Sequence, residues 1–144
     1  MQVHSLNRDT ADFRTYAGTN PGAGNNYSIG LPQNAFHQIL QVQCLLTTDA
    51  NAANRVVVCG GGASGTNRFL AVAPAVQTAS TAVLYSFQQG VAPLDMSTNG
   101  LVMTSPIGEY FIMHGGFTLN IDVVNIQAGD AITAILYTLR TWYY

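Results

Sequence analysis

The last quarter of the chain, residues 117–144, constrains the fold more than any other stretch. Between residues 118 and 123, Leu, Ile and Val alternate with polar neighbours, which is the two-residue period of a strand with one buried face. Residues 125–130 contain Asn, Gly and Asp and break this alternation. A second run, residues 131–142, is rich in β-branched and aromatic side chains and is almost continuously apolar. The pattern predicts a long terminal hairpin whose return strand lies centrally in a sheet.

Two residues of this predicted hairpin are expected to shape its ends. Gly129 is expected to adopt a positive φ and so to let the chain reverse, because glycine has no Cβ to oppose that conformation. Trp142 is expected to cover one edge of the core with its large ring.

The rest of the chain also has the patterns of strands and not of helices. Shorter apolar or alternating runs are separated by loops rich in Gly, Pro and Asn. The predicted strands are residues 36–47, 55–59, 68–73, 81–87, 101–104 and 110–113. No long stretch repeats with the 3.6-residue period of an amphipathic helix. The chain is therefore predicted to be all-β.

Seven or eight strands with antiparallel alternation favour a two-sheet antiparallel sandwich. The number favours a jelly-roll-like arrangement, in which a long first strand and a long last strand are neighbours in one sheet. An immunoglobulin-like sandwich is the nearest alternative. It is disfavoured because Trp142 is nearly the last residue, where a central-strand tryptophan between two cysteines cannot be built.

Residues 1–31 are predicted to form an extended N-terminal arm, followed by the sandwich domain at residues 32–144. The arm has many Asn, Gly, Thr and Pro residues and no sustained period, but it carries aromatic residues and a charge cluster. A frayed, solvated terminus is the simpler alternative. The candidate interface residues in the arm are Arg8, Asp9, Asp12, Phe13, Arg14, Tyr16 and Tyr27.

The composition indicates a surface used for protein contacts. Only 8% of the residues are charged, against about 25% in ordinary soluble proteins. All five basic residues are arginines and seven residues are tyrosines. Protein interfaces favour Arg, Tyr and Met and contain few Lys, Glu and Asp. We therefore expect assembly with other subunits, with a homotrimer as the predicted oligomer.

Several classes of partner are not expected. A formal net charge of −2 with scattered arginines argues against nucleic acid, which requires a clustered basic face. No stretch approaches the 18 or so apolar residues needed to span a bilayer, and the start of the chain has no apolar leader, so we expect a soluble product that is not exported. Cys44 and Cys59 are expected to be reduced, with a disulfide as the less favoured alternative.

The sequence motifs that could support chemistry fail on inspection. Gly60, Gly62 and Gly65 match a dinucleotide-binding pattern, but no helix follows and the acidic residue that should follow is missing. Residues 114–116, His-Gly-Gly, lack a correctly placed nucleophile elbow and are expected to form a tight turn.

The titratable residues also lack the spacing of a reactive centre. The three histidines are isolated from one another and from the cysteines, so no metal site is predicted. Among the acids, only Asp9 and Asp12 are close in sequence, and they lie beside arginines. We therefore predict no catalytic residue, no cofactor and no enzymatic activity.

Several of these features together resemble the small jelly-roll decoration or cement proteins of tailed bacteriophages. They are the polar arm, the short strands, the Gly-Gly-Phe-Thr-Leu entry at residues 115–119, the turn at residues 125–130 and the closing Leu-Arg-Thr-Trp at residues 139–142. The resemblance covers about residues 100–144.

The resemblance implies a structural protein that binds the outside of a capsid. Proteins of this family bind as trimers over junctions between major capsid protein subunits and stabilise the head. The implied location is the virion surface, after assembly in the host cytoplasm. The alternative is a carbohydrate-binding or receptor-binding module of a tail or fibre, because sandwich loops rich in Asn, Tyr and Trp can stack on sugars. A hydrolase with a scattered active site is the third hypothesis.

Overall fold

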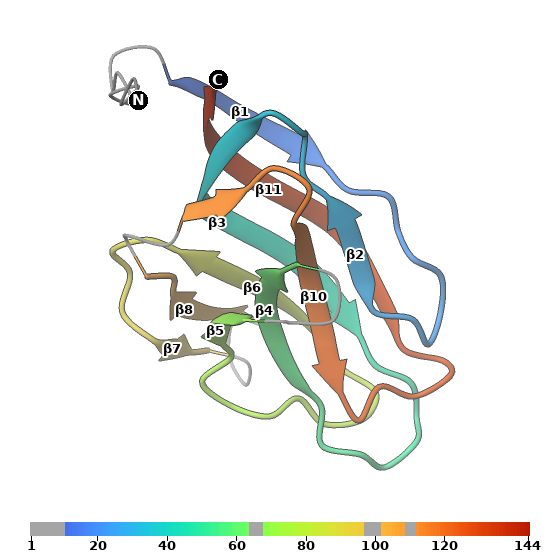
Figure 1. Cartoon of the computed structure of the whole chain (residues 1–144). Coiled ribbons are helices and arrows are strands. Elements are labelled where there is room, and N and C mark those ends of the chain that lie inside the picture. Colours follow the sequence, from blue (N-terminus) through green and yellow to red (C-terminus); the bar gives the residue numbers. More distant parts are fainter. Residues whose placement is uncertain (1–10, 64–67, 97–101, 109–111) are drawn as a thin grey trace.

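The computed structural model describes residues 11–63, 68–96, 102–108 and 112–144. Within these residues the chain forms strands packed as two sheets (Figure 1). The larger sheet has the order β1 (Asp12–Ala17), β11 (Ala131–Tyr143), β3 (Ala35–Thr47), β6 (Ala82–Gln88), β8 (Val102–Pro106) and β7 (Leu94–Asp95), with β9 (Ile112–His114) pairing with β3. The smaller sheet has the order β2 (Tyr27–Gly30), β10 (Thr118–Val124), β4 (Val56–Gly62) and β5 (Arg68–Val72).

The order of the strands is that of a jelly roll. Four antiparallel pairs are nested within one another along the chain: β1 with β11, β2 with β10, β3 with β6, and β4 with β5. Rolling this nested ribbon brings β11 against β3 and β10 against β4, also antiparallel. The prediction of an all-β, two-sheet, jelly-roll-like sandwich is confirmed. The predicted first and last strands, residues 36–47 and 131–142, are the neighbouring strands β3 and β11.

The short strands β7, β8 and β9 are additions between β6 and β10. β8 pairs with β6 in parallel, and β7 returns antiparallel to β8. β9 lies beside the first residues of β3, while β6 lies beside the last ones. These additions lengthen the larger sheet without changing the rolled order of the eight principal strands.

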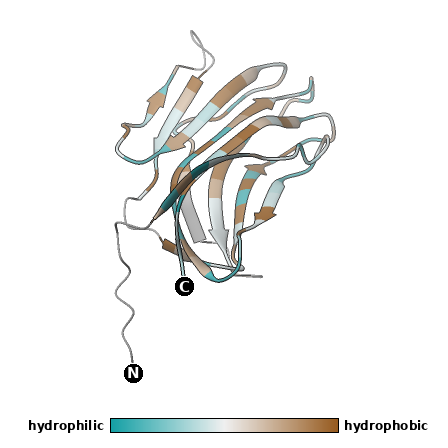
Figure 2. Cartoon of the chain, turned by 90° about the horizontal axis from the view of Figure 1, so that it is seen from above, coloured by the Kyte–Doolittle hydropathy of each residue, from teal (hydrophilic) through white to brown (hydrophobic). Residues whose placement is uncertain are grey.

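The core lies between the two sheets. Apolar and polar residues alternate along the strands (Figure 2), and the apolar ones face inward. Ile39, Val42, Cys44 and Leu46 of β3 are fully buried. Cys44 and Cys59 carry free thiols, and burial raises the pKa of the Cys44 thiol to about 12.

The predicted N-terminal arm is part of the sandwich from Asp12 onward. β1 pairs with β11 over its whole length, and β2 pairs with β10. The predicted boundary at residues 31 and 32 is therefore wrong. Both strands are short and polar on one side, so the sequence pattern did not distinguish them from an unpaired arm. Residues 1–10 lie outside the described part of the chain.

The predicted terminal hairpin is also wrong, although its two strands are present. β10 belongs to the smaller sheet and β11 to the larger one, so residues 125–130 form an arch from one sheet to the other. Asn125 has the positive φ, 60°, that was expected of Gly129. Gly129 is needed for a different reason: a Cβ at this position would lie 2.8 Å from Cβ and Oδ2 of Asp49.

Candidate functional site

A band of aromatic side chains crosses one end of the larger sheet on its outer face. Its members come from four neighbouring strands and from the C-terminal residue. We call it the aromatic band, and it consists of Phe13, Phe36, His114, Arg140, Trp142 and Tyr144.

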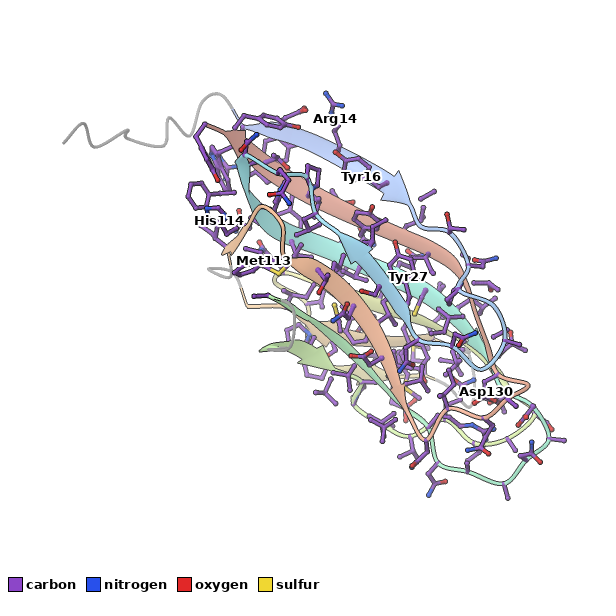
Figure 3. The ribbon with its side chains drawn as sticks, turned by 45° about the vertical axis from the view of Figure 1, so that its right-hand side comes forward. Arg14, Tyr16, Tyr27, Met113, His114 and Asp130 are labelled. Atoms are coloured by element: carbon purple, nitrogen blue, oxygen red, sulfur yellow. The ribbon has the colours of Figure 1, made fainter. Side chains whose placement is uncertain are left out.

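The register of the strands places these side chains together. Phe13 of β1 lies opposite Arg140 of β11. Phe36 of β3 lies opposite Trp142 on one side and opposite His114 of β9 on the other. Directly opposed residues in a sheet point to the same face, so pairing alone aligns the band across the strands. Figure 3 shows His114 at the end of the sandwich where β1 begins and β11 ends.

The band is held by ring contacts and by one shared arginine. The guanidinium carbon of Arg140 lies 5.1 Å from the ring centre of Phe13 and 4.9 Å from that of Trp142. These are cation–π distances, and each such contact contributes about 0.5 to 2 kcal/mol. At the other end, the ring centre of Phe36 lies 5.1 Å from that of His114 and 5.2 Å from that of Tyr144.

The hydrogen bonds of His114 define its tautomer. Nδ1 lies 3.0 Å from the carbonyl oxygen of Gly115, which can only accept, so Nδ1 carries the proton in the neutral ring. Nε2 lies 3.1 Å from the Tyr144 hydroxyl and accepts a hydrogen bond from it. This hydrogen bond and the ring contact with Phe36 place the Tyr144 ring in the band.

The band combines exposed rings with a buried one. Phe13 is 59% exposed and Tyr144 61%, whereas Trp142 is 7% exposed beneath Arg140. Protein interfaces are enriched in Trp, Tyr, Phe and Arg, and such residues carry most of the binding energy when they are clustered. The band therefore resembles protein interfaces in its residue types.

The outer face beside the band is nearly free of charge. Facing positions of β3 and β6 pair glutamine with glutamine, glutamine with serine and leucine with leucine: Gln41 with Gln88, Gln43 with Ser86, and Leu45 with Leu84. Arg140 is the one charged residue among the outward positions of β1, β3, β6 and β11. A partner surface placed on this face needs to desolvate few charges.

The predicted interface residues lie in different environments in the structure. Asp12 and Arg14 form an ion pair with 2.6 Å between Oδ2 and Nε, and both lie at the surface. Tyr16 stacks on Tyr137, with ring centres 5.3 Å apart. Tyr27 is a core residue with 3% exposure, so its assignment to an interface is wrong. Figure 3 shows Arg14 pointing away from the sandwich and Tyr27 inside it.

Phe13 is the one predicted interface residue that the structure places in the aromatic band. Arg8 and Asp9 lie outside the described residues. Burial, followed by the proximity of Tyr137, raises the pKa of the Tyr27 hydroxyl to about 12, so that group stays neutral in the core.

Most of the band was not predicted from the sequence, although one local pattern points to part of it. Arg140, Trp142 and Tyr144 stand at alternate positions and therefore share a face of the last strand. Phe36 and His114 join them only through the pairing of β3 with β9 and β11, which no local pattern gives.

A buried charge cluster lies at the opposite end of the sandwich, where Figure 3 shows Asp130. Arg55 and Asp130 have fully buried side chains, and the Asp49 side chain is 17% exposed. Arg55 Nε and Nη2 donate to the two oxygens of Asp130, each at 2.9 Å, and Nη2 also donates to Asp49 Oδ1 at 2.7 Å. Nη1 donates to the carbonyl oxygens of Asn51 and Ala53. All five guanidinium donors are thereby used.

The pKa values of this cluster follow from its hydrogen bonds. Burial works against the charged form of Asp130. The bonds from Arg55 and from the backbone N–H groups of Asp49 and Gln127 outweigh it and lower the pKa of that carboxyl. The hydrogen bond with Asp130 raises the pKa of Arg55 despite burial. The cluster is a saturated ion network that joins two loops, and it has no lone pair or proton to offer a substrate.

A shallow depression lies near this cluster but has no reactive groups. It is lined by Ala52, Ala53, Asn54, Thr78 and Ala79. None of these side chains titrates, and only one amide and one hydroxyl are present, so the depression does not define a catalytic site.

The motifs noted in the sequence have structural roles. Gly60 and Gly62 of the glycine pattern lie in β4. At Gly61, between them, a Cβ would be 2.6 Å from the Thr118 carbonyl oxygen and 2.7 Å from Met113 Sδ, so glycine permits close packing there. Gly65 lies outside the described residues.

His37 is fully buried, with Nδ1 3.0 Å from Thr141 Oγ1 and Nε2 2.9 Å from the Pro32 carbonyl oxygen. The described residues contain no group of three or more side chains suited to hold a metal ion.

Fold and surface together define a jelly-roll sandwich with an aromatic band across one end of its larger sheet. No protein-family model, no curated protein and no solved structure matches the chain. Within the described ranges, no helix of the length and apolarity needed to cross a membrane is present.

Proposed function

We propose that this chain is a non-enzymatic structural protein that binds the outside of a viral capsid and stabilises it as a decoration protein. The aromatic band is the observation that carries the proposal. It offers exposed rings around a buried Trp142 and an arginine, next to a sheet face almost free of charge. Such a surface suits a large, permanent contact better than a small ligand.

The partner in this proposal is the major capsid protein of the same virus. A decoration protein contributes stability by bridging subunits, for which a rigid β-sandwich with a flat face is suited. The proposed location is the surface of the virion. The homotrimer expected from the sequence stays a prediction, which a mass measurement tests.

Co-sedimentation with shells assembled from the major capsid protein of the same genome tests the proposal. Tyr144→Ser removes an exposed ring of the band, and Val124→Ser is the matched control, because Val124 is 50% exposed on the smaller sheet. The parent is expected to sediment with the shells. Tyr144→Ser is expected to bind roughly tenfold more weakly, and the control like the parent.

Two results would contradict the proposal. One is a parent chain that does not sediment with the shells; the other is a Tyr144→Ser variant that binds as well as the control. Binding to a glycan array, with no binding to shells, would favour the carbohydrate-binding alternative instead. The buried position of Trp142 beneath Arg140 argues against that alternative, because the one tryptophan is not free to stack on a sugar.

A further inference from the structure

The outer edge of β1 presents backbone groups that no described strand uses. β1 pairs with β11 on one side. The Gly18 amide donates to the Ile135 carbonyl oxygen at 2.9 Å, which shows that the even-numbered residues of this stretch turn their backbone groups toward β11. Phe13, Thr15 and Ala17 therefore turn their N–H and C=O groups away from the sheet.

This edge lacks most of the usual protections against pairing with another chain. Natural edge strands are shortened, bulged, or supplied with Pro or Lys. β1 has six residues in unbroken register, with no proline, lysine or glycine. At the other end of the larger sheet, β7 has only two residues. In the smaller sheet, the β5 carbonyl of Val72 accepts a hydrogen bond from Ser105 Oγ.

The charges of β1 are complementary to a second copy of the same strand. When two copies align antiparallel about a twofold axis at Phe13, each Asp12 lies opposite Arg14 of the other copy. The residues with free backbone groups then face each other, Phe13 with Phe13 and Thr15 with Ala11. A shift of one residue in the axis places Arg14 opposite Arg14, which is repulsive. A further shift places Arg14 opposite Tyr16, which leaves the charges unmatched.

We infer that two copies of this chain pair through β1, antiparallel, with Phe13 opposite Phe13. Phe13 is 59% exposed and its ring lies beside Arg140, so the pairing joins two aromatic bands across the twofold axis. The contact is isologous, because the same patch serves both copies. It differs from the expected trimer, which needs two different patches. It does not depend on the capsid proposal.

The association is expected to be weak in free solution, since one six-residue strand pair buries less than a standard interface. Sedimentation equilibrium at concentrations up to on the order of 100 µM is therefore the suitable measurement. The parent is expected to approach the dimer mass. Asp12→Arg places four arginines at the contact and is expected to weaken dimerisation roughly tenfold or more.

A variant in which Asp12 and Arg14 exchange places distinguishes loss of specific charge pairing from a general effect of changed charge. Asp12→Arg combined with Arg14→Asp restores an acid opposite a base in the same register, so the dimer is expected to return. The Asp12 to Arg14 ion pair lies at the surface, so these changes are expected to alter the stability of the monomer little. Thermal melts at low concentration serve as the control for folding.

Cysteine substitutions measure the register directly. Phe13→Cys places two thiols about 5.5 Å apart between Cα atoms, within reach of a disulfide, and oxidised glutathione is expected to produce covalent dimers. Thr15→Cys places its two thiols roughly 13 Å apart along the strands and is expected to produce few. Cys44 and Cys59 are fully buried and do not compete.

The inference is overturned by a parent that stays monomeric over this concentration range or that forms a trimer. It is also overturned if Asp12→Arg leaves the dimer intact, if the double exchange fails to restore it, or if Thr15→Cys crosslinks better than Phe13→Cys. Loss of shell binding with an intact dimer would count against the capsid proposal alone.

Discussion

Arg55 is the residue on which one end of the sandwich depends. Its guanidinium donates to two carboxylates and two carbonyl groups, all of them in the loop before β4 or in the arch before β11. Nothing in the local sequence marks this role, since Arg55 and Asp130 are 75 residues apart and each stands alone among neutral residues. In the sequence both are isolated charges, and only the rolled topology brings them together.

Replacing Arg55 with Met is expected to lower the free energy of unfolding by about 3 to 5 kcal/mol. The reason is that the substitution leaves Asp130 buried with a charge that no cation balances. Arg14→Met is the control, because the Arg14 side chain is 62% exposed and its ion pair is expected to contribute less than about 1 kcal/mol. Urea denaturation of dilute protein measures both. Equal losses in the two variants would show that the buried network does not stabilise the fold.

At the scale of elements, the sequence predicts strands better than it predicts their partners. The runs at residues 36–47 and 131–142 correspond to β3 (Ala35–Thr47) and β11 (Ala131–Tyr143). A period of two residues reports which face is buried, and both β10 and β11 bury one face. It does not report whether two successive strands pair with each other or cover the same core from opposite sheets. The hairpin prediction failed for this reason, and the aromatic band was missed for the same one.

The arch between β10 and β11 provides a test of why glycine stands at residue 129. Gly129→Ala is expected to destabilise the protein by about 1 to 3 kcal/mol, because the new Cβ overlaps the Asp49 side chain. Asp49 cannot move away easily, since Oδ1 accepts from Arg55 and Oδ2 from the Gly129 amide. Gly30→Ala is the control, because a Cβ there has no neighbour within 4 Å.

Thermal melts of the two glycine variants test whether steric overlap with Asp49, and not the loss of glycine's backbone flexibility, destabilises Gly129→Ala. Steric overlap predicts that only Gly129→Ala melts at a lower temperature. If both variants melt like the parent, the arch is able to widen around a Cβ and the contact with Asp49 does not constrain it.

At the scale of the whole molecule, the two ends of the sandwich have separate roles. The end with the buried ion network joins the sheets, and the end with the aromatic band carries the exposed rings (Figure 3). The all-β class, the two-sheet sandwich and the low charge could be predicted from the sequence, because they follow from periodicity, the number of strands and composition. The separate roles of the two ends could not be predicted, because each end is assembled from strands and loops far apart in the chain.

The ion network also determines how stability depends on pH. The pKa of Asp130 lies below its usual value of 3.8 in the folded state. Its stabilising contribution is therefore complete above about pH 5 and is lost as the pH falls through the lowered pKa. Asp122 acts in the opposite direction, because burial raises its pKa above 3.8, so its ionisation lowers stability as the pH rises through the window just above that value.

Urea denaturation between about pH 7 and pH 2 is expected to resolve the two contributions. On acidification the stability of the parent should first rise as Asp122 takes up a proton and then fall, at lower pH, as Asp130 takes up a proton. Asp122→Asn should abolish the early gain and keep the later loss, because the two windows lie on opposite sides of pH 3.8. The Arg55→Met variant should show a weaker loss at low pH, since Asp130 then lacks the cation that lowers its pKa. If the free energy of unfolding falls as steeply at low pH in Arg55→Met as in the parent, carboxylates other than those of the buried network control acid unfolding.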